Sequence, residues 1–524
     1  MAVERRTIGR GQQRRRMMPS TPPQPRSPTP PLPAAPKPDE PDQKAGSLAT
    51  MVRNSAIFTV GEVSLKVMTA LLAPLFTILL TPTEYGIWGL GTMVQSLLAP
   101  LFSLGLHGAV TRFYFDSDDP AERARFQGTI SAFLLAWGSA FAVALLLAAP
   151  FALPHLLPSL PMLPYVPLIV GSVFLGLAAT VPTATWTAAE RAGRVVMVRM
   201  ASNAVYLLTA VGLVAGAEIG VVGVFWARFA AATLLAVPLL VWAWRKLPLA
   251  WHSPYLRAAL VFGLPLVPHL LAHWVLALSD RYLLERLVGT AAVGVYTSAY
   301  VFTDAVNLVA VSLNGAFVPM LNRHLDKPEG DAQVGRAVSW FVAVVLAMSA
   351  TVSLLSPGIV RSFFDVRYHG AAEVTAILGA AGALQGLYYI WVGALFYRKQ
   401  SGRVPLLTMV GGGVNVGLNL LWIPVLGLAG AALATATGYA VLLLGVYVTA
   451  RVGGGLPVER RRVAGLLGLF ACVVAVGFVI GDRLSPPMEL AVKLAVLAAA
   501  AAFALRVGLV SREDQAVVMA KLRR

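Results

Sequence analysis

Apolar runs of helix length follow one another almost without pause between about residues 50 and 510 of this chain. The hydrocarbon core of a bilayer is about 30 Å thick, so one α-helix needs roughly 20 apolar residues to cross it. Hydrophobic residues make up 57% of the chain and charged residues only 13%, which is too little polar surface to cover a water-soluble core. The sequence therefore predicts an all-α polytopic membrane protein.

We expect about fourteen transmembrane helices, because fourteen apolar segments are separated by short stretches that carry Pro, Gly or Arg. They are predicted at residues 54–80, 85–109, 128–152, 164–186, 195–217, 219–244, 258–284, 293–319, 334–356, 371–397, 404–423, 425–450, 462–481 and 488–510. The division between 404 and 450 is the least defined, since the sequence GLAGAA suits either a tight turn or the interior of a helix.

Most of the 42 Lys and Arg residues fall in alternate connections when the N-terminal segment is placed in the cytoplasm. Connections rich in Lys and Arg stay on the cytoplasmic side, so we predict a multi-pass protein of the cytoplasmic (inner) membrane with both termini in the cytoplasm. The basic residues behind the formal net charge of +17 then lie mostly at helix ends. Because they do not form one basic surface, no nucleic-acid partner is expected. Residues 1–47 are rich in Pro and Arg with little to bury, which predicts a disordered cytoplasmic tail.

Four glycine landmarks recur in the same order at an offset of 207 to 209 residues. The pairs are Gly86 and Gly294, Gly108 and Gly315, Gly193 and Gly402, and Gly220 and Gly427. Because the repeat unit holds six spans, an even number, both copies enter the membrane from the same side. We therefore predict two parallel six-helix repeats that form two lobes. The expected parts are an N-lobe at 48–245, a C-lobe at 246–451, two extra helices within 452–510 and a cytoplasmic tail at 511–524.

Basic side chains inside the predicted spans mark candidate substrate-cavity positions, because an ionised group at membrane depth usually faces a bundle interior or a wet cavity. Lys66 lies one helical turn from Glu62, which allows either a pair within the helix or an anion site that faces a cleft. Arg281, near the outer end of the seventh span, is a further candidate cavity cation.

Arg228 in the sixth span has no acidic residue nearby on its own helix. Two interpretations follow from this. Arg228 forms an ion pair with Asp280 or Asp304 of the other lobe, or it belongs to a cationic wall that binds phosphate, for which the planar guanidinium is suited.

Acidic and amide side chains at membrane depth are candidates for coupling to a cation or for structural pairing. Asp280 lies near the outer end of the seventh span, and Asp304 and Asn307 lie three residues apart on one face of the eighth. Together with Glu62, they suit a coupling cation or proton, or plain interhelical hydrogen bonds.

No GxSxG, HExxH or Walker motif occurs in the sequence, and most outer connections are short. We therefore predict a transporter that is not an enzyme and that needs no cofactor. The single cysteine, Cys472, excludes a disulfide within the chain and a thiolate metal site, and no metal site is predicted.

The segments TPTEYGIWGL and SLGLHGAVTRFYF resemble the start of the Wzx-type oligosaccharide flippases. These are polysaccharide-biosynthesis transporters of the multidrug/oligosaccharidyl-lipid/polysaccharide exporter superfamily. The later segment FGLPLVPHLLAHWVLALSDRYLLERLVGTAAVGVYTSAY resembles their seventh and eighth spans. The resemblance covers about residues 48–450.

The resemblance implies that undecaprenyl-pyrophosphate-linked oligosaccharide repeat units are flipped across the cytoplasmic membrane by alternating access. The product would serve O-antigen (lipopolysaccharide), capsule or exopolysaccharide synthesis. The head group would cross a cationic cavity, which makes Lys66 and Arg228 the residues expected to contact the pyrophosphate. A polysaccharide polymerase and a chain-length regulator are the implied protein partners, beside the lipid-linked glycan and the bilayer.

Two alternatives stay open from the sequence. A multidrug or metabolite exporter of the same fold, coupled to a cation, would need a deep carboxylate such as Glu62 or Asp304. An enzyme that acts on the same lipid-linked glycan would need a long outer loop with catalytic side chains, and the sequence offers none.

Overall fold

The computed structural model describes residues 57, 60, 61, 63–68, 72–248, 251–327, 330–480 and 486–509. Over these residues the regular structure is helical, and they contain no strand. Residues 63–68 and 72–79 are helical and precede α2. The helices that follow are α2 (Pro82–Ser103), α3 (Leu106–Phe113), α4 (Pro120–Leu156), α5 (Tyr165–Gly176), α6 (Thr180–Ala188), α7 (Ala192–Val211), α8 (Val221–Lys246), α9 (Ser253–Gly263), α10 (Leu266–Leu287), α11 (Thr290–His324), α12 (Gly330–Phe363), α13 (Ala371–Tyr397), α14 (Val404–Val452), α15 (Arg460–Ile480) and α16 (Pro486–Arg506).

Eleven helical segments in the described part of the chain are long and apolar enough to cross a membrane, or twelve if the bent pair α2 and α3 counts as one span. In this count α5 and α6 form one segment, as do α9 and α10. The axes of α2 and α3 differ by 46°, and Leu104 and Gly105 between them have positive φ angles. The prediction of an all-α polytopic membrane protein is confirmed.

Helix α14, which has 49 residues, contains two of the predicted spans because the chain turns at Gly427 (φ 55°, ψ −128°). Few residues other than glycine adopt these angles. The two halves run back along each other, since a Cβ added to Gly411 would lie 3.1 Å from the Gly438 carbonyl oxygen, and one added to Gly445 would lie 3.0 Å from Leu407. GLAGAA therefore forms a tight turn.

Two of the four glycine pairs occupy matching places in the structure. Gly220 precedes α8 with φ 62° and ψ −150°, close to the angles of Gly427. A Cβ on Gly86 would collide with the Thr290 carbonyl oxygen, and a Cβ on Gly294 would collide with that of Pro82. Positions 82 and 290 are separated by the repeat offset, as are 86 and 294. The crossing of α2 and α11 thus has the reciprocal contacts of an isologous interface, as a pseudo-twofold repeat requires.

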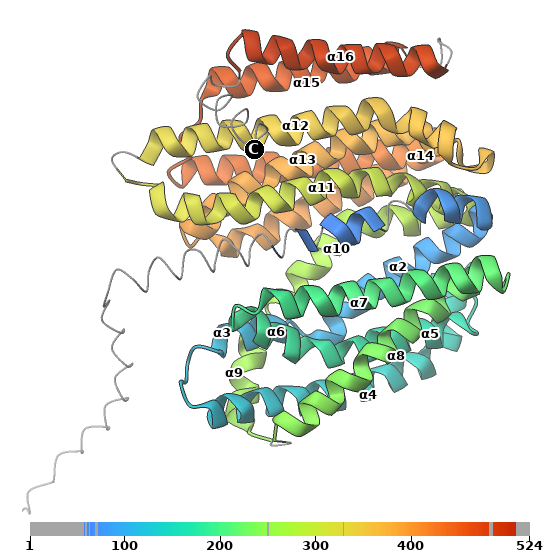
Figure 1. Cartoon of the computed structure of the whole chain (residues 1–524), viewed down its shortest axis with the longest axis vertical. Helices are drawn as coiled ribbons and strands as arrows, with labels where there is room; N and C mark the ends of the chain where they lie inside the picture. The colour runs from blue at the N-terminus through green and yellow to red at the C-terminus, as the bar shows by residue number, and fades with distance from the viewer. Residues whose placement is uncertain are drawn as a thin grey trace, which may run out of the picture. The chain divides into compact units, whose positions relative to one another are not determined.

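Two groups of helices are visible in Figure 1, which we name the N-terminal bundle (α2–α8) and the C-terminal bundle (α10–α14). Helix α9 belongs by sequence to the predicted C-lobe but packs against α3 and α4 of the N-terminal bundle. Helices α15 and α16 pack on α12. The lobe limits at residues 245 and 451 stay predictions.

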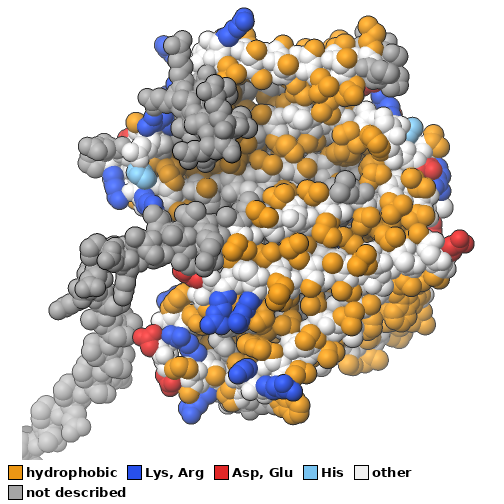
Figure 2. Space-filling model, in the orientation of Figure 1, with side chains coloured by type: hydrophobic (Ala, Val, Ile, Leu, Met, Phe, Trp, Pro, Cys, Tyr) orange, Lys and Arg blue, Asp and Glu red, His pale blue; other side chains and the backbone are white. Residues whose placement is uncertain are grey.

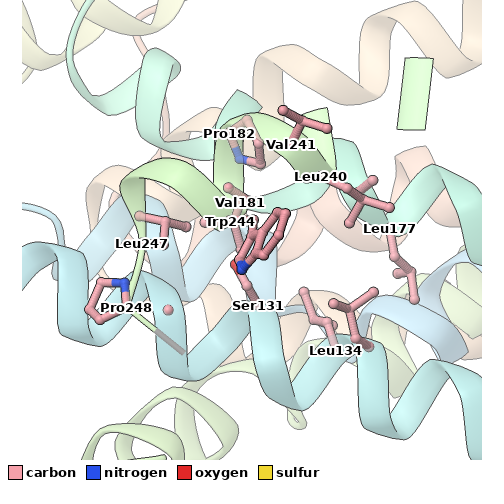
Figure 3. Close-up of a pocket in the computed structure, with 14 residues that line it drawn as sticks. Ser131, Leu134, Leu177, Val181, Pro182, Leu240, Val241, Trp244, Leu247 and Pro248 are labelled. Atoms are coloured by element: carbon pink, nitrogen blue, oxygen red, sulfur yellow. The ribbon is translucent and has the colours of Figure 1, made fainter. Parts of the chain in front are cut away.

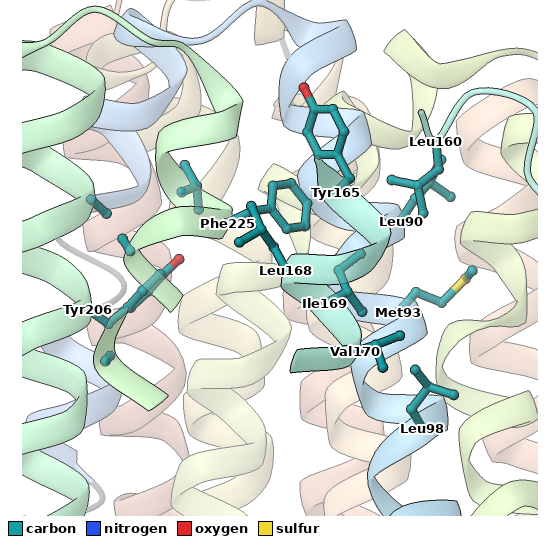
Figure 4. Close-up of a cluster of buried hydrophobic side chains, with 14 of the residues drawn as sticks. Leu90, Met93, Leu98, Leu160, Tyr165, Leu168, Ile169, Val170, Tyr206 and Phe225 are labelled. Atoms are coloured by element: carbon teal, nitrogen blue, oxygen red, sulfur yellow. The ribbon is translucent and has the colours of Figure 1, made fainter. Parts of the chain in front are cut away.

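Buried apolar side chains form the core of the N-terminal bundle (Figure 4). Leu90 and Met93 of α2 lie against Ile169 of α5, and the rings of Tyr165 and Phe225 meet edge to face with centroids 5.1 Å apart. This core fixes the rotation of α5 and α8 about their axes.

The surface is mostly hydrophobic, as Figure 2 shows for one face. Phe151 and Val425, for example, are 79% and 80% exposed. Apolar exposure on this scale is unfavourable in water and suits the hydrocarbon of a bilayer. Lys and Arg are more numerous toward the left margin of Figure 2, where α11 connects to α12 in Figure 1. We call this the basic end.

Candidate functional site

A polar cavity of about 420 Å³ lies inside the N-terminal bundle, between α2, α3, α5, α6, α7 and α8. Its polar lining consists of hydroxyls, a histidine and two arginines and contains no carboxylate. These side chains are Ser103, His107, Ser172, Thr180, Thr183, Arg199, Ser202 and Arg228. A cavity with several hydroxyl donors, two guanidinium groups and no acid is complementary to an oxyanion.

Arg228 is placed in this cavity by the register of α8. Phe225, three residues earlier, is buried in the core, so the next turn of the same face brings Arg228 to the cavity. The Arg228 guanidinium carbon lies 4.3 Å from the ring centroid of buried Tyr206 on α7. The stacked ring holds the guanidinium plane without using its N–H donors. Arg199, an exposed residue of α7, supplies the second cation.

The ion pair that the sequence suggested between Arg228 and Asp280 or Asp304 does not form among the described residues. Asp304 lies 3.3 Å from Lys66 Nζ, and Asp280 is surrounded by hydroxyl groups within the C-terminal bundle. Arg228 therefore fits the second sequence interpretation, a cation on a cavity wall.

Asp280 of α10 is the centre of a buried polar cluster and is 1% exposed. Its Oδ2 accepts hydrogen bonds from the hydroxyls of Tyr296 (2.8 Å), Thr435 (3.2 Å) and Tyr300 (3.3 Å). Its Oδ1 accepts the backbone N–H of Arg281 at 2.8 Å. These donors come from α10, α11 and α14, so the carboxylate ties three helices together.

The cluster continues along α14 through two asparagines. Ser279 donates to Asn415 Oδ1 (3.2 Å), Asn419 Nδ2 donates to the same oxygen (3.0 Å), and Asn415 Nδ2 approaches Thr435 at 3.4 Å. Asn419 Oδ1 is buried and has no hydrogen-bond partner among the described residues. An unpaired buried acceptor is costly, so this oxygen is available to a cation.

No group of three or more His, Cys, Asp or Glu side chains that suits a metal ion is present in the part of the chain that the structure describes. The oxygens around Asp280 are one carboxylate with neutral amides and hydroxyls. One negative charge among neutral oxygens suits a monovalent cation better than a divalent one.

Arg281, predicted as a cavity residue, is 8% exposed. Its guanidinium carbon lies 4.9 Å from the Tyr300 ring centroid, and its Nε is buried without a hydrogen-bond partner among the described residues. The side chain therefore belongs to the packed surroundings of Asp280 and not to an open cavity wall.

Lys66 connects the helix before α2 to the C-terminal bundle. Its Nζ lies 3.3 Å from Asp304 Oδ2 on α11, and both side chains are about half exposed (44% and 51%). Glu62, which the sequence suggested as the partner of Lys66, lies outside the described residues. Asn307, one turn from Asp304, accepts a hydrogen bond from the Tyr389 hydroxyl of α13 at 3.1 Å, which is the interhelical bonding considered for it.

The connection between α12 and α13, residues 364–370, holds the chain segment just before α2 at the end opposite the basic end. The Tyr368 hydroxyl donates to the Leu80 carbonyl (3.0 Å), and Arg367 Nη2 donates to the Ile78 carbonyl (3.2 Å). Asp365 holds Arg367 through Nε (2.7 Å) and the backbone N–H (2.9 Å). These two bonds from Arg367 keep the pKa of Asp365 below its ordinary value.

An apolar hollow of about 330 Å³ lies between α4, α6 and α8 (Figure 3). Leu134, Val181 and Leu240 point into it, and the Trp244 ring lies across it. It carries no charged lining side chain, so it offers nothing to an anionic head group.

Several residues of these sites are not evident from the sequence. In the sequence, nothing distinguishes Tyr296 and Tyr300 from the other residues of an apolar span. Asn415 and Asn419 carried a usable signal, because two amides four residues apart inside an apolar run share one helix face. Arg199 stands close to a predicted helix end, where arginine usually only marks the cytoplasmic side.

The model of the family described as "Polysaccharide biosynthesis protein" matches residues 51–324 of this chain. No curated protein sequence matches the chain significantly.

Solved structures of transporters show the same fold at low sequence identity. The lipid II flippase MurJ in an inward closed conformation has a TM-score of 0.71 at 11% identity, over 86% of this chain and 99% of its own. An inward-facing multidrug resistance MATE family transporter of the MOP superfamily has a TM-score of 0.60 at 15% identity, over 78% and 99%. A MOP superfamily transporter from Pyrococcus furiosus has a TM-score of 0.56 at 15% identity, over 80% and 96%.

The family match spans more than half of the chain, and the fold is that of multi-span flippases and exporters. The chain therefore belongs to the polysaccharide biosynthesis protein family.

Proposed function

We propose that this protein flips a polyprenyl-pyrophosphate-linked oligosaccharide from the cytoplasmic to the outer leaflet of the cytoplasmic membrane. The observation that carries this proposal is the polar cavity around Arg228. It combines two guanidinium groups with hydroxyl donors and lacks a carboxylate, which suits a pyrophosphate. An undecaprenyl carrier and a pathway to O-antigen, capsule or exopolysaccharide are the finer part of the same proposal, as are a polymerase and a chain-length regulator as partners.

Arg228 is the residue to which we assign the first pyrophosphate contact. Its guanidinium is held by Tyr206 with its N–H groups free of any ion pair among the described residues. Lys66 is assigned a second role, because its half-exposed bridge to Asp304 can exchange one anionic partner for another. Arg281 is too buried to meet the head group directly and is assigned to the support of the Asp280 cluster.

The Asp280 cluster supports coupling to a monovalent cation. Its one buried carboxylate is linked through Thr435 and Asn415 to Asn419, whose Oδ1 is unpaired among the described residues. Binding a cation there would draw α10 and α14 together, and the energy of that contact can bias the bundle between two states. Asp304 and Asn307 are assigned to structural pairing.

The test uses full-length protein in liposomes that contain a fluorescent polyprenyl-pyrophosphate oligosaccharide. A membrane-impermeant reductant reports the fraction of the lipid that reaches the outer leaflet. A charge-assisted hydrogen bond contributes about 1.5–3 kcal/mol, so Arg228→Ala should slow flipping by roughly tenfold or more. Arg228→Lys, which keeps the charge and loses the planar fork, should be intermediate.

Arg245→Ala is the matched control, because Arg245 lies on the same helix, is exposed and is outside the cavity. Equal flipping by Arg228→Ala and Arg245→Ala would remove Arg228 from the site. Transport of a cationic dye without any flipping of the lipid-linked sugar would support the alternative, a cation-coupled exporter of the same fold.

We place the basic end, and with it both termini, in the cytoplasm, because Lys and Arg collect there. In a Cys472→Ser background, Val366→Cys should react with an impermeant maleimide added to intact cells. Phe115→Cys, in the connection that follows α3, should stay unlabelled until the cells are opened. The reverse pattern would invert the topology.

A further inference from the structure

A cavity of about 840 Å³ lies at the basic end of the C-terminal bundle, between α12, α13, the second half of α14 and α15. Its body is apolar and includes Leu387, Trp391, Leu443 and Leu467. Among the described residues, α15 packs on α12 and α16 but makes no comparable contact with α13 or α14. The cavity is the space that this one-sided packing of α15 leaves open.

The rim of the cavity has a fixed shape. Arg398, at the end of α13, donates to the carbonyls of Gly453 (2.7 Å) and Gly455 (2.9 Å) and to Asp326 (3.1 Å). Gly454 between them has φ +117°, and a Cβ there would collide with the Arg398 guanidinium. The connection from α14 to α15 is therefore built around this arginine and held in one conformation.

The two acidic side chains beside the rim are already engaged: Asp326 pairs with Arg398, and Glu459 pairs with Arg462. Glu459 accepts two hydrogen bonds from Arg462 (2.7 and 2.8 Å) and one from the Ser339 hydroxyl of α12 (2.7 Å). These bonds fasten the first turn of α15 to α12, and Glu459 does not line the cavity.

Two arginines from different helices line the cavity. Arg451 ends α14 and Arg460 begins α15; both are exposed, and the described residues offer neither an ion pair. No acidic side chain is among the lining residues. Helix α15 starts with three arginines and has no acid in its first turn, although the helix dipole favours an anion there. The rim therefore has the charge that an external anion would complement.

We propose that this cavity binds an anionic diacyl phospholipid. Its phosphate lies between Arg451 and Arg460, and one acyl chain lies along α13 and α14 against Trp391. The edge-to-face pair of Trp391 and Tyr447, with centroids 4.8 Å apart, is the aromatic contact typical of the interfacial depth. The volume falls in the range of about 300–1,000 Å³ of specific ligand sites, and basic pockets between spans on the cytoplasmic side recognise acidic lipids. The bound lipid fills the space between α15 and the helices α13 and α14, against which α15 does not pack closely.

The test is lipid titration of the delipidated full-length protein, followed by native mass spectrometry. Phosphatidylglycerol and phosphatidylcholine with the same acyl chains are compared. Each arginine that contacts the bound head group should contribute about fivefold in affinity for an acidic lipid. Arg451→Gln combined with Arg460→Gln should therefore weaken binding of the first phosphatidylglycerol molecule by about 30-fold. The control is Arg461→Gln with Arg245→Gln, which removes the same charge outside the cavity and should change this affinity by no more than about twofold.

A second measurement locates the acyl chain. Phosphatidylglycerol with brominated acyl chains should quench the fluorescence of Trp391, which is identified as the part of the signal that Trp391→Phe removes. Ala464→Trp fills the cavity without a change of charge and should abolish tight binding of phosphatidylglycerol. Equal affinity for phosphatidylcholine, equal loss in the control or an unquenched Trp391 would overturn the proposal. Displacement of phosphatidylglycerol by a polyprenyl phosphate at equal concentration would assign the cavity to the substrate's own tail instead. None of these outcomes depends on the flippase assignment.

Discussion

Replacing Asp280 with asparagine separates the structural role of this carboxylate from a role in cation binding. The side chain is buried and accepts four hydrogen bonds, three of them from hydroxyls at Oδ2. In Asp280→Asn the amide oxygen can remain at the Oδ1 position and still accept the Arg281 N–H. The amide NH₂ then replaces Oδ2 among hydroxyls.

The energetic consequences of the two substitutions differ. A hydroxyl can rotate and accept where it previously donated, so Asp280→Asn leaves about one donor unpaired and lowers stability by about 1–3 kcal/mol. Asp280→Ala removes both oxygens from the buried cluster and should cost about 3–5 kcal/mol, the usual effect of removing one partner of a buried charged group. Asparagine therefore keeps the packing and loses only the charge.

The expected difference appears when a cation is added. A bound ion stabilises the folded state by RT ln(1 + [L]/Kd), or about 2.7 kcal/mol at a concentration of 100 Kd. Wild-type protein should gain this stability from NaCl relative to choline chloride at equal ionic strength, whereas Asp280→Asn should gain almost nothing. The measurement is the unfolding midpoint of the full chain in detergent, followed by tryptophan fluorescence.

Asp331→Asn is the matched control, since Asp331 is exposed in the first turn of α12 and its loss leaves the cluster intact. An equal sodium-dependent gain in Asp280→Asn and wild type would refute cation binding at this cluster. Destabilisation of Asp280→Asn as large as that of Asp280→Ala would refute the argument that the hydroxyls reorient.

Three further outcomes follow from the structure. Gly294→Val should prevent the close crossing of α2 and α11 and lower the yield of folded protein. Gly315→Ala on the same helix should not lower the yield, because a Cβ at Gly315 would meet open space. Equal yields of the two variants would contradict this crossing. The double variant Lys66→Asp with Asp304→Lys exchanges the two charges and should restore part of the transport that either single change removes. The recovered interaction energy should be about 0.2–1 kcal/mol, as for a half-exposed ion pair. A double variant that transports no better than the worse single variant would argue against the bridge. The pKa of Asp365 is lowered, so the ionised carboxylate stabilises the folded connection at every pH above the ordinary aspartate pKa. This stabilisation is lost as the pH falls through the lowered value. Hydrogen exchange of residues 364–370, corrected for intrinsic rates, should therefore be equally slow at about pH 7 and about pH 5, and faster in Asp365→Asn at both.

The spans could be predicted from the sequence because a bilayer imposes one physical requirement on every helix that crosses it. The predicted span at 371–397 coincides with α13 (Ala371–Tyr397), and most other limits differ by a few residues. The bend between α2 and α3 was not predicted. It depends on the close approach of Gly105 and Gly263, which are far apart in the sequence.

The glycine repeat was also readable, because a close crossing or a sharp turn leaves room for one residue type only. Gly220 and Gly427 kept their conformations in both halves, and Gly86 and Gly294 kept reciprocal contacts.

The pairing of charges was decided by tertiary structure alone. Membrane depth identifies which ionisable side chains need a partner, so the sequence determined the all-helical fold, the repeat and the candidates Lys66, Arg228, Asp280 and Asp304. It did not determine that Lys66 meets Asp304, that Arg228 stacks on a tyrosine, or that hydroxyls surround Asp280. Hydrophobic periodicity specifies which face of a helix is buried, whereas the partner of a buried charge depends on the rotation and depth of a second helix, which only the packed bundle sets.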